Sequence, residues 1–281
     1  MTQKSILITG CSSGIGLCCA QGLKQRGWRV FATARKDSDV DMLRSLGLEA
    51  HQLDLDDSSS IQRAFAWVLQ QTGGTLDALF NNGAYGLPGA VEDVRREDLR
   101  ALFETNFFGP HELTCLALPV MRRQGHGRIV QNSSILGFAA MPFRGAYNAS
   151  KFALEGLTDT LRIELHDTNI RISLIEPGPI TSRFRANAFA MYQKHINKET
   201  SPFRRKYESM EARLKKKGPA VPFTLPPEAV LAKLIHALES NNPNPRYYVT
   251  TPTIFFGYLK RFLSTRIMDK ILLKASGDGN R

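Results

Sequence analysis

The segment from Thr9 to Gly16 limits most strongly what this chain can fold into. It has the sequence Thr-Gly-Cys-Ser-Ser-Gly-Ile-Gly, and it separates an apolar run from an expected helix over 17–26. Glycines let a backbone pass close to a pyrophosphate, and the helix N-terminus offers free N–H groups and the positive end of its dipole. A plain strand-to-helix turn would not need this glycine spacing, so the segment predicts a dinucleotide site. The residues assigned to it are Gly10, Ser12, Ser13, Gly14, Ile15 and Gly16.

Short apolar runs recur along the chain, with helix-length polar segments between them. This alternation is typical of βαβ units that build a parallel sheet. A chain of 281 residues with 42% hydrophobic content can form one α/β domain of this kind. We therefore expect a doubly wound parallel sheet of seven strands, at 5–9, 29–33, 49–53, 78–81, 128–132, 171–175 and 247–250.

The last third of the chain breaks this rhythm. We expect residues 1–251 to form the catalytic domain, with a substrate lid at about 184–225 that is polar, basic and poor in β-branched residues. Aromatic side chains such as Phe143, Phe184 and Tyr192 predict an apolar entrance, although ordinary packing explains them equally well. Residues 252–281 form a basic amphipathic extension, which could lie on an anionic membrane, pack on the enzyme body or join a dimer.

Charge distribution excludes one class of partner. The net charge is +11, but residues 183–281 hold 19 Lys and Arg against 7 Asp and Glu, so the excess is confined to that part. No helix-turn-helix, zinc-finger or RNP-type pattern accompanies it, and we expect no nucleic-acid binding. Four cysteines lack CxxC spacing and six histidines lack paired ligand spacing, so no disulfide framework and no metal site is predicted. The N-terminal segment lacks the features of a signal peptide, which indicates a cytoplasmic protein, with contact to the inner face of the membrane as an option.

Cofactor preference is indicated at the end of the second strand. An NAD enzyme usually places an acidic residue there to bind the ribose hydroxyls, but this chain has Arg35 and Lys36. A guanidinium and a nearby ammonium suit a 2′-phosphate, so NADP(H) is predicted, and a solvated basic turn is the alternative. Asp54, followed by Leu55, could accept a hydrogen bond from adenine, and Asn81 ends the fourth strand. Asp54 and Asn81 could equally be turn-forming residues.

Tyr147 and Lys151 carry the proposed proton chemistry. They are four residues apart in an expected helix, a spacing that places them on one face. A free tyrosine has a pKa of about 10, and an ammonium about 5 Å away supplies roughly 3 kcal/mol toward a phenolate. Ser134, at the end of the fifth strand, can reach the same point and bind a substrate oxygen. A lone Tyr-x-x-x-Lys is a common accident, but here the Ser-Ser-x-x-Gly stretch and the glycine loop accompany it.

With these motifs in place, the chain resembles the short-chain dehydrogenase/reductase family over about residues 5–184. The pattern TGxxxGxG is met by Thr9, Gly10, Gly14 and Gly16, and the catalytic tetrad by Asn106, Ser134, Tyr147 and Lys151. The resemblance implies a Rossmann-type fold, with Tyr147 as general acid or base, Ser134 orienting the carbonyl, and Lys151 lowering the tyrosine pKa while holding the nicotinamide ribose. It implies that Asn106 anchors a water that relays protons. The remaining cofactor positions it implies are Asn81, Gly83, Pro177, Gly178, Ile180 and Ser182.

Two departures from the family pattern stand out. The usual Asn-Asn-Ala-Gly becomes Asn-Asn-Gly-Ala, which moves the glycine to Gly83, and the usual threonine of the nicotinamide turn falls at Ser182 with Thr181 beside it. Within the family, residues 173–180 and 266–272 are similar to bacterial YbbO-type aldehyde reductases, relatives of hydroxysteroid and retinol dehydrogenases.

The resemblance implies an NADP(H)-dependent reductase of small lipophilic aldehydes or ketones, in a homodimer or homotetramer. The alternatives are the reverse reaction, as a hydroxysteroid- or retinol-like alcohol dehydrogenase, and a cofactor-sensing scaffold without turnover. The intact serine, tyrosine and lysine argue against the scaffold.

Overall fold

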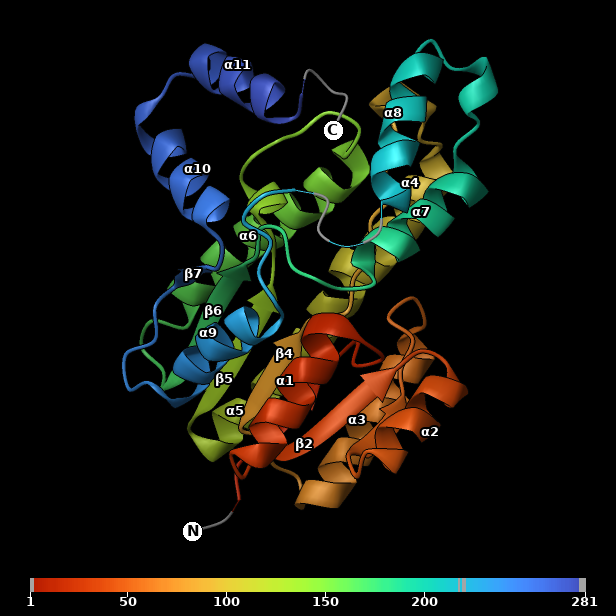
Figure 1. Cartoon of the computed structure of the whole chain (residues 1–281). Helices are drawn as coiled ribbons and strands as arrows, with labels where there is room; N and C mark the ends of the chain where they lie inside the picture. Colours follow the sequence, from red (N-terminus) through yellow and green to blue (C-terminus); the bar gives the residue numbers. More distant parts are fainter. Residues whose placement is uncertain (1–2, 217, 219–220, 278–281) are drawn as a thin grey trace.

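The computed structural model describes residues 3–216, 218 and 221–277, and it is built around one parallel sheet (Figure 1). All seven strands are parallel, in the order β3-β2-β1-β4-β5-β6-β7, which confirms the expected doubly wound sheet. The order reverses direction beside β1, so a crevice opens between β1 and β4 at their carboxyl ends. The strands are β1 (Ser5–Ile8), β2 (Arg29–Ala34), β3 (Glu49–Gln52), β4 (Ala78–Asn81), β5 (Gly127–Asn132), β6 (Ile170–Glu176) and β7 (Arg246–Tyr248).

The strands lie close to the positions expected from the sequence, and the largest difference is at the last one. β7 ends at Tyr248, whereas the expected strand continues to Thr250. The chain turns there because Thr250 is the N-cap of the helix α10 (Thr251–Phe262) and Pro252 lies in its first turn. Proline favours the first turn of a helix and cannot donate to a strand ladder, so the strand stops early.

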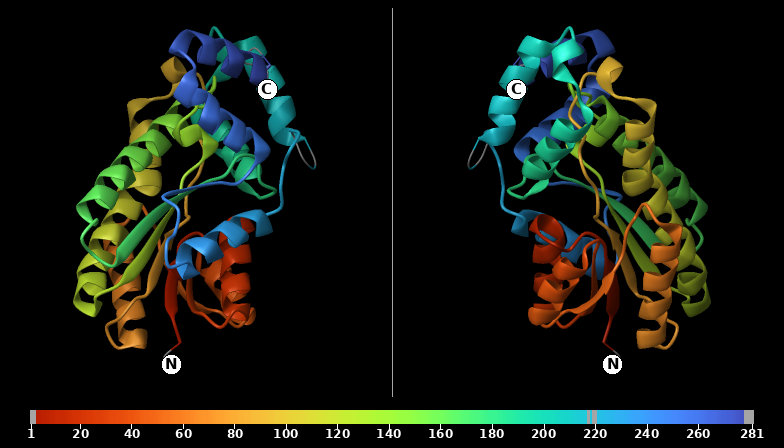
Figure 2. Two further views of the ribbon diagram at one scale, coloured as in Figure 1. Left: turned by 90° about the vertical axis from the view of Figure 1, so that its left-hand side faces the viewer. Right: turned by 90° about the vertical axis from the view of Figure 1, so that its right-hand side faces the viewer.

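Side chains alternate between the two faces of the sheet, and helices cover both (Figure 2). Ile6 and Ile8 of β1 join one buried cluster, while Leu7 between them joins the other. The first cluster includes side chains of α1 (Gly14–Gln25), α2 (Asp37–Ser45) and α9 (Glu228–Glu239). The second is formed with α3 (Ser58–Thr72), α5 (Gly109–Gln124) and the end of α6 (Gly145–Glu164). The sheet is therefore held rigidly between two apolar layers.

Two groups of helices stand above the carboxyl ends of the strands (Figure 1). On one side lie α4 (Arg96–Phe103), α7 (Phe184–His195) and α8 (Arg204–Lys215), and on the other α10 (Thr251–Phe262) and α11 (Thr265–Ala275). Short helical turns complete the described chain: η1 (Val91–Asp93), η2 (Glu104–Phe108), η3 (Ile135–Gly137) and η4 (Lys198–Thr200).

The segment expected to be a polar lid contains a buried cluster of its own. Tyr207 of α8 is fully buried, and its hydroxyl accepts a hydrogen bond from the backbone N–H of Ala90 (2.9 Å) and donates to Asp93. Tyr192, Met210 and neighbouring apolar side chains pack in the same cluster. The basic surface of this segment therefore covers a well-packed interior that the overall composition concealed.

Candidate active site

The glycine loop between β1 and α1 is shaped for close approach. Gly10 has φ +70° and Gly14 has φ +56°, a conformation that other residues adopt only with strain. A Cβ on Gly10 would meet the Cα of Gly83 at 2.7 Å, and one on Gly16 would collide with the carbonyl oxygen of Gly10. Only glycine fits at these two positions. The cradle therefore presents bare backbone where a pyrophosphate would lie, as a dinucleotide site requires.

The first turn of α1 is free to bind an anion. Its N-cap, Ser13, has an extended backbone and makes no side-chain hydrogen bond to the helix. No acidic residue lies in the first turn, so nothing there neutralises the positive end of the helix dipole. Together with the glycine cradle, this donor set fits the diphosphate of a nicotinamide dinucleotide.

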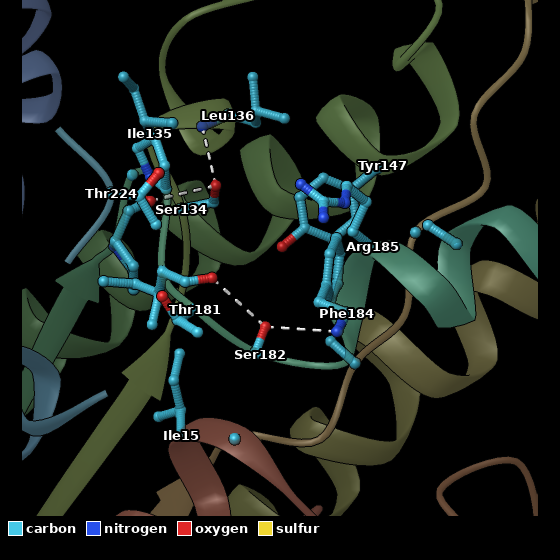
Figure 3. A pocket seen from close by; sticks show the side chains of 18 of the residues that line it. Ile15, Ser134, Ile135, Leu136, Tyr147, Thr181, Ser182, Phe184, Arg185 and Thr224 are labelled. Atoms are coloured by element: carbon cyan, nitrogen blue, oxygen red, sulfur yellow. Dashed lines mark hydrogen bonds between the residues drawn. The ribbon is translucent and has the colours of Figure 1, made fainter. Parts of the chain in front are cut away.

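A cavity of about 770 Å³ opens from this loop toward the helices above the sheet. Ser134, Tyr147 and Lys151 line it, so the structure brings these three predicted residues to the same space as the glycine loop. Figure 3 shows Ser134, Tyr147 and, from the glycine loop, Ile15. The other predicted cofactor residues that line the cavity are Gly10, Ser12, Ser13, Gly14, Ile15, Gly16, Gly83, Pro177, Gly178, Ile180 and Ser182.

Tyr147 and Lys151 face one another on the first turns of α6. The ammonium nitrogen of Lys151 lies 5.7 Å from the centre of the Tyr147 ring and donates a 2.7 Å hydrogen bond to the carbonyl oxygen of Asn132. Burial lowers the pKa of Lys151 to about 8, against the opposing charge of Glu155. Burial also raises the pKa of the Tyr147 phenol above its ordinary value, and the Ser134 hydroxyl acts in the opposite direction. For the phenol, desolvation therefore outweighs the hydrogen bond from Ser134.

Ser134 lies where β5 ends and η3 begins. Its hydroxyl accepts a hydrogen bond from the backbone N–H of Leu136 (3.1 Å) and donates a long one to the carbonyl oxygen of Pro177 (3.4 Å). These contacts hold the hydroxyl at the edge of the cavity, and it is 9% exposed. Figure 3 shows Ser134 on one side and Tyr147, Phe184 and Arg185 together on the other. The phenyl ring of Phe184 meets the Tyr147 ring edge-on, with centroids 5.3 Å apart.

Asn106 is buried outside the cavity, in the π-helical turn η2. Its side chain binds both backbone polar groups of Tyr85, at 2.9 and 3.0 Å, and donates to the Ser150 hydroxyl at 3.2 Å. The carbonyl group of Asn106 lacks the usual helical donor four residues on, because Pro110 has no N–H. π-helical turns of this kind often mark functional sites.

The predicted adenosine side lies beyond this cavity. Arg35, Lys36, Asp54 and Leu55 do not line it. Arg35 and Lys36 are exposed at the end of β2, and the Arg35 charge is among those that lower the pKa of Asp56 and Tyr85, whose larger rise comes from burial. The charge of Arg35 is thus close enough to act on both of these groups.

Asn81 also lies away from the cavity. Its side-chain amide donates to the carbonyl oxygen of Pro110 (3.2 Å) and to the Thr114 hydroxyl (3.1 Å), both on α5. These contacts join β4 to α5, so a direct contact with a cofactor stays a prediction.

The next residue, Asn82, is a site residue that the sequence reasoning missed. Its amide donates to the carbonyl oxygens of Thr9 (2.9 Å) and Gly10 (3.2 Å), and its own oxygen accepts from Asn132 (2.8 Å). Because Lys151 binds the carbonyl of Asn132, one set of hydrogen bonds connects the glycine loop to the catalytic lysine. The sequence did contain a signal for this contact, because Asn82 and Asn132 are polar residues at the carboxyl ends of two apolar strands.

The two departures from the family pattern both fall in this site. Gly83 lies where the two loops touch, and a Cβ there would meet the Leu55 side chain at 2.8 Å. The Ser182 hydroxyl accepts a 3.3 Å hydrogen bond from the backbone N–H of Phe184, whereas the backbone of Thr181 binds Leu225 (2.9 Å). Both residues line the cavity, so either hydroxyl is placed to contact a ligand.

Comparison with known proteins agrees with this geometry. A model of the short chain dehydrogenase family matches residues 4–193. The chain belongs to this family. It is therefore an oxidoreductase with a Rossmann-type fold.

Two similar proteins cover 96% and 66% of the chain. An uncharacterized oxidoreductase YbbO of Escherichia coli K12 is 44% identical over 270 residues, covering 96% of this chain and 94% of that protein. A 3-ketodihydrosphingosine reductase of Bacteroides thetaiotaomicron is 37% identical over 188 residues, covering 66% of this chain and 68% of that protein.

Among solved structures, a short-chain dehydrogenase from Streptomyces avermitilis superposes with a TM-score of 0.75 at 27% identity, covering 99% of this chain and 97% of that one. Other solved structures of this fold are described as complexes with NAD and with 5-hydroxy-NADP.

Proposed function

We propose that this chain is an NADP(H)-dependent oxidoreductase that interconverts lipophilic aldehydes or ketones and their alcohols. The supporting observation is that Ser134, Tyr147 and Lys151 line the same cavity as the glycine loop. The bacterial relative named as a ketodihydrosphingosine reductase acts on a lipophilic ketone, and the apolar lining of the cavity suits such a substrate. An alcohol dehydrogenase for hydroxysteroid- or retinol-like substrates is the same chemistry reversed, with direction set by the ratio of NADPH to NADP+.

Each side chain has a defined part in this proposal. Bound NADPH would supply the hydride, and the oxidised ring would add positive charge near the phenol. Tyr147 donates its proton to the substrate oxygen in reduction and accepts one in oxidation, while Ser134 donates a hydrogen bond to that oxygen. Lys151, with a pKa of about 8, is mostly charged at neutral pH and stabilises the phenolate. The carbonyl group of Asn106 is suited to anchor a water that returns the proton to solvent.

A substrate screen tests the proposal directly. Aldehydes, ketones and alcohols of increasing chain length are incubated with NADPH, NADP+, NADH or NAD+, and the absorbance of the reduced cofactor is followed. We expect oxidation of NADPH with aldehydes or ketones, and a kcat/KM that rises with chain length because the cavity lining is largely apolar. Absence of turnover with every carbonyl compound and alcohol would contradict the proposal.

Cofactor choice is proposed to depend on Arg35. Replacing it by Asp should lower the ratio of kcat/KM for NADPH to that for NADH by about 10- to 100-fold, since a charge-assisted hydrogen bond to the 2′-phosphate is lost. The matched control is Arg123→Asp on α5, which makes the same charge change at an exposed position away from the cavity. An unchanged ratio in Arg35→Asp would refute the phosphate site.

The domain assignments also belong to the proposal. Residues 184–225 act as the substrate lid, since residues of α7, α8 and the following loop line the cavity. Residues 252–281 form an extension whose described part is α10 and α11. Assembly into a homodimer or homotetramer stays a prediction.

The extension is further proposed to contact an anionic membrane surface. None of the described helices is long and apolar enough to cross a bilayer. On α10, however, Phe255, Tyr258 and Phe262 recur at helical spacing and are 55%, 56% and 81% exposed. Basic side chains accompany them on both helices, namely Lys260, Arg261, Arg266, Lys270 and Lys274. Exposed aromatic residues beside basic ones are typical of helices that lie in a lipid interface.

Vesicle sedimentation tests this contact. The protein should sediment with phosphatidylserine vesicles more than with phosphatidylcholine vesicles. Phe255→Ser with Phe262→Ser should reduce that binding about 10³-fold or more, because about 2–3 kcal/mol of apolar contact is lost per aromatic side chain. Ile163→Ser, also an exposed apolar residue but on α6, is the control. Equal sedimentation of wild type and the double variant would contradict the contact.

A further inference from the structure

The cavity carries an excess of positive charge on its substrate side. Its lining includes Arg144, Arg183, Arg185 and Arg213 besides Lys151. None of the lining residues in the described part of the chain is Asp or Glu. A proton relay needs the lysine but has no use for these arginines.

Three of the arginines act on one another from different elements. Arg144 directly precedes α6, three residues before Tyr147, and donates a 2.9 Å hydrogen bond to the carbonyl oxygen of Pro142. Burial, and then the charge of Arg213, lower the pKa of Arg144 to about 9. Burial, and then the charge of Arg185, lower the pKa of Arg213. The body of the enzyme and the lid thus bring like charges together in a poorly solvated space.

Arg185 and Arg213 are placed differently. Arg185 donates hydrogen bonds to the carbonyl oxygens of Lys216 and Gly218, so it has a structural role in closing the lid segment. Arg213, on α8, lines the cavity, and its Nε is buried without a hydrogen-bond partner among the described residues. A buried guanidinium N–H that lacks a partner is costly, and the cost is offset when an anion accepts a hydrogen bond from it.

Apart from these charged groups, the cavity lining is largely apolar. Leu87, Met141, Phe184, Leu214 and Phe223 are among the residues that line it. A ligand that matches both features has an apolar body with a single oxyanion. Guanidinium groups bind carboxylates and phosphates through paired, planar hydrogen bonds.

We propose that the substrate is an amphiphilic oxo compound that carries a carboxylate or phosphate group, and that Arg144 and Arg213 bind this oxyanion while the carbonyl lies at Tyr147. The placement of the carbonyl at Tyr147 rests on the proposed function. The binding of the oxyanion does not, because it follows from the charge and burial of the arginines alone.

Binding of unreactive probes tests whether the arginines bind an oxyanion, and it needs no turnover. Decanoate, decyl phosphate and 1-decanol are titrated calorimetrically into the full-length protein with saturating NADPH, which keeps the probes from the proposed phosphate site and cannot oxidise the alcohol. We expect one of the two anions to bind about tenfold or more tightly than decanol, and whichever binds more tightly identifies the oxyanion. Arg213→Gln should remove this preference, and Arg213→Lys should retain part of it because the charge remains.

The control variant is Arg205→Gln, which removes the same charge from an exposed position on α8 outside the cavity. Equal binding of decanoate, decyl phosphate and decanol to the wild-type protein would overturn the inference. So would a preference that survives Arg213→Gln, or an Arg213→Gln variant whose only defect is a raised KM for NADPH. Thermal unfolding of each variant identifies any loss of the fold, and Arg213→Lys preserves the test if the glutamine variant does not fold.

Kinetics then separates the two proposals. The kcat/KM for the ω-oxo acid of decanoate should exceed that for decanal about tenfold or more, and Arg213→Gln should bring the ratio close to one. Turnover of decanal with no preference for the oxo acid would refute the oxyanion site while the proposed function stands. Tight anion binding without turnover of any carbonyl compound would refute the function and keep the oxyanion site.

Discussion

Replacement of Tyr147 by Phe is expected to lower kcat by about 10²- to 10⁴-fold, the usual contribution of a positioned general acid or base. Phenylalanine keeps the ring that packs edge-on against Phe184 but removes the only atom able to transfer the proton. The affinity for NADPH should change little, because the glycine loop and the first turn of α1 are untouched. The measurement is steady-state kinetics with the best carbonyl substrate, and cofactor binding is followed by fluorescence titration.

The control for this variant is Tyr258→Phe, which removes a hydroxyl from an exposed tyrosine on α10. It should retain wild-type kcat. The comparison also decides between an enzyme and a cofactor-sensing scaffold, since a scaffold would keep its biological activity in Tyr147→Phe. Retained turnover in that variant would remove the phenol from the mechanism.

The fold follows from the sequence because its signals are local and repeated. Each apolar run is the right length for a buried parallel strand, and the helix-length segments between them leave only βαβ connections. Where the expectation differs, a local feature explains it, as with the helix start at Thr250 and Pro252 that ends β7 early. Local patterns are readable from the sequence because they depend on neighbouring residues.

Site residues could be assigned where one motif contains them. The four-residue spacing of Tyr147 and Lys151 fixes their common face, and the structure places the ammonium group 5.7 Å from the ring centre. Asn82 and the arginines were not found in this way. Their partners lie far along the chain, as with Asn82 and Asn132 or Arg144 and Arg213, and only the folded structure brings such residues together.

The lid, residues 184–225, also could not be described fully from its sequence. Its polar, basic composition suggested an inserted lid and not part of the core, yet Tyr192, Tyr207 and Met210 are buried in one apolar cluster. Three or four apolar residues on one face are enough to anchor a helix. In a segment that is mostly charged, so few apolar residues do not stand out from the composition. Composition alone therefore underestimates how firmly these helices are anchored.

Replacement of Lys151 by Met is expected to lower kcat by about 10²-fold or more. At neutral pH the variant should also be more stable to unfolding than the wild-type protein. Lys151 is 3% exposed, and burial lowers its pKa from 10.5 to about 8. This difference corresponds to about 3 kcal/mol against the charged form in the folded state. Part of the gain from removing that charge is offset, because the carbonyl of Asn132 loses its donor, at a cost of about 1–3 kcal/mol.

The pH dependence of stability separates the effect of the Lys151 charge from the effect of the lost hydrogen bond to Asn132. Between pH 8 and 10.5 the unfolded chain holds the lysine proton more tightly than the folded one, so wild-type stability rises with pH across this window. Lys151→Met has no such group, and its stability advantage is full below pH 8 and should shrink by about 3 kcal/mol by pH 10.5. Urea unfolding of the cofactor-free proteins at several pH values measures this difference.

The matched control is Lys233→Met, an exposed lysine on α9, whose stability should follow the wild type at every pH. Parallel stability curves for wild type and Lys151→Met would mean that the ammonium group is well solvated, and the account of its lowered pKa would be wrong. If the stability difference between Lys151→Met and the wild type becomes smaller as the pH rises, and turnover is lost, the buried charge is destabilising. The fold would then maintain that charge at the position where it stabilises a phenolate.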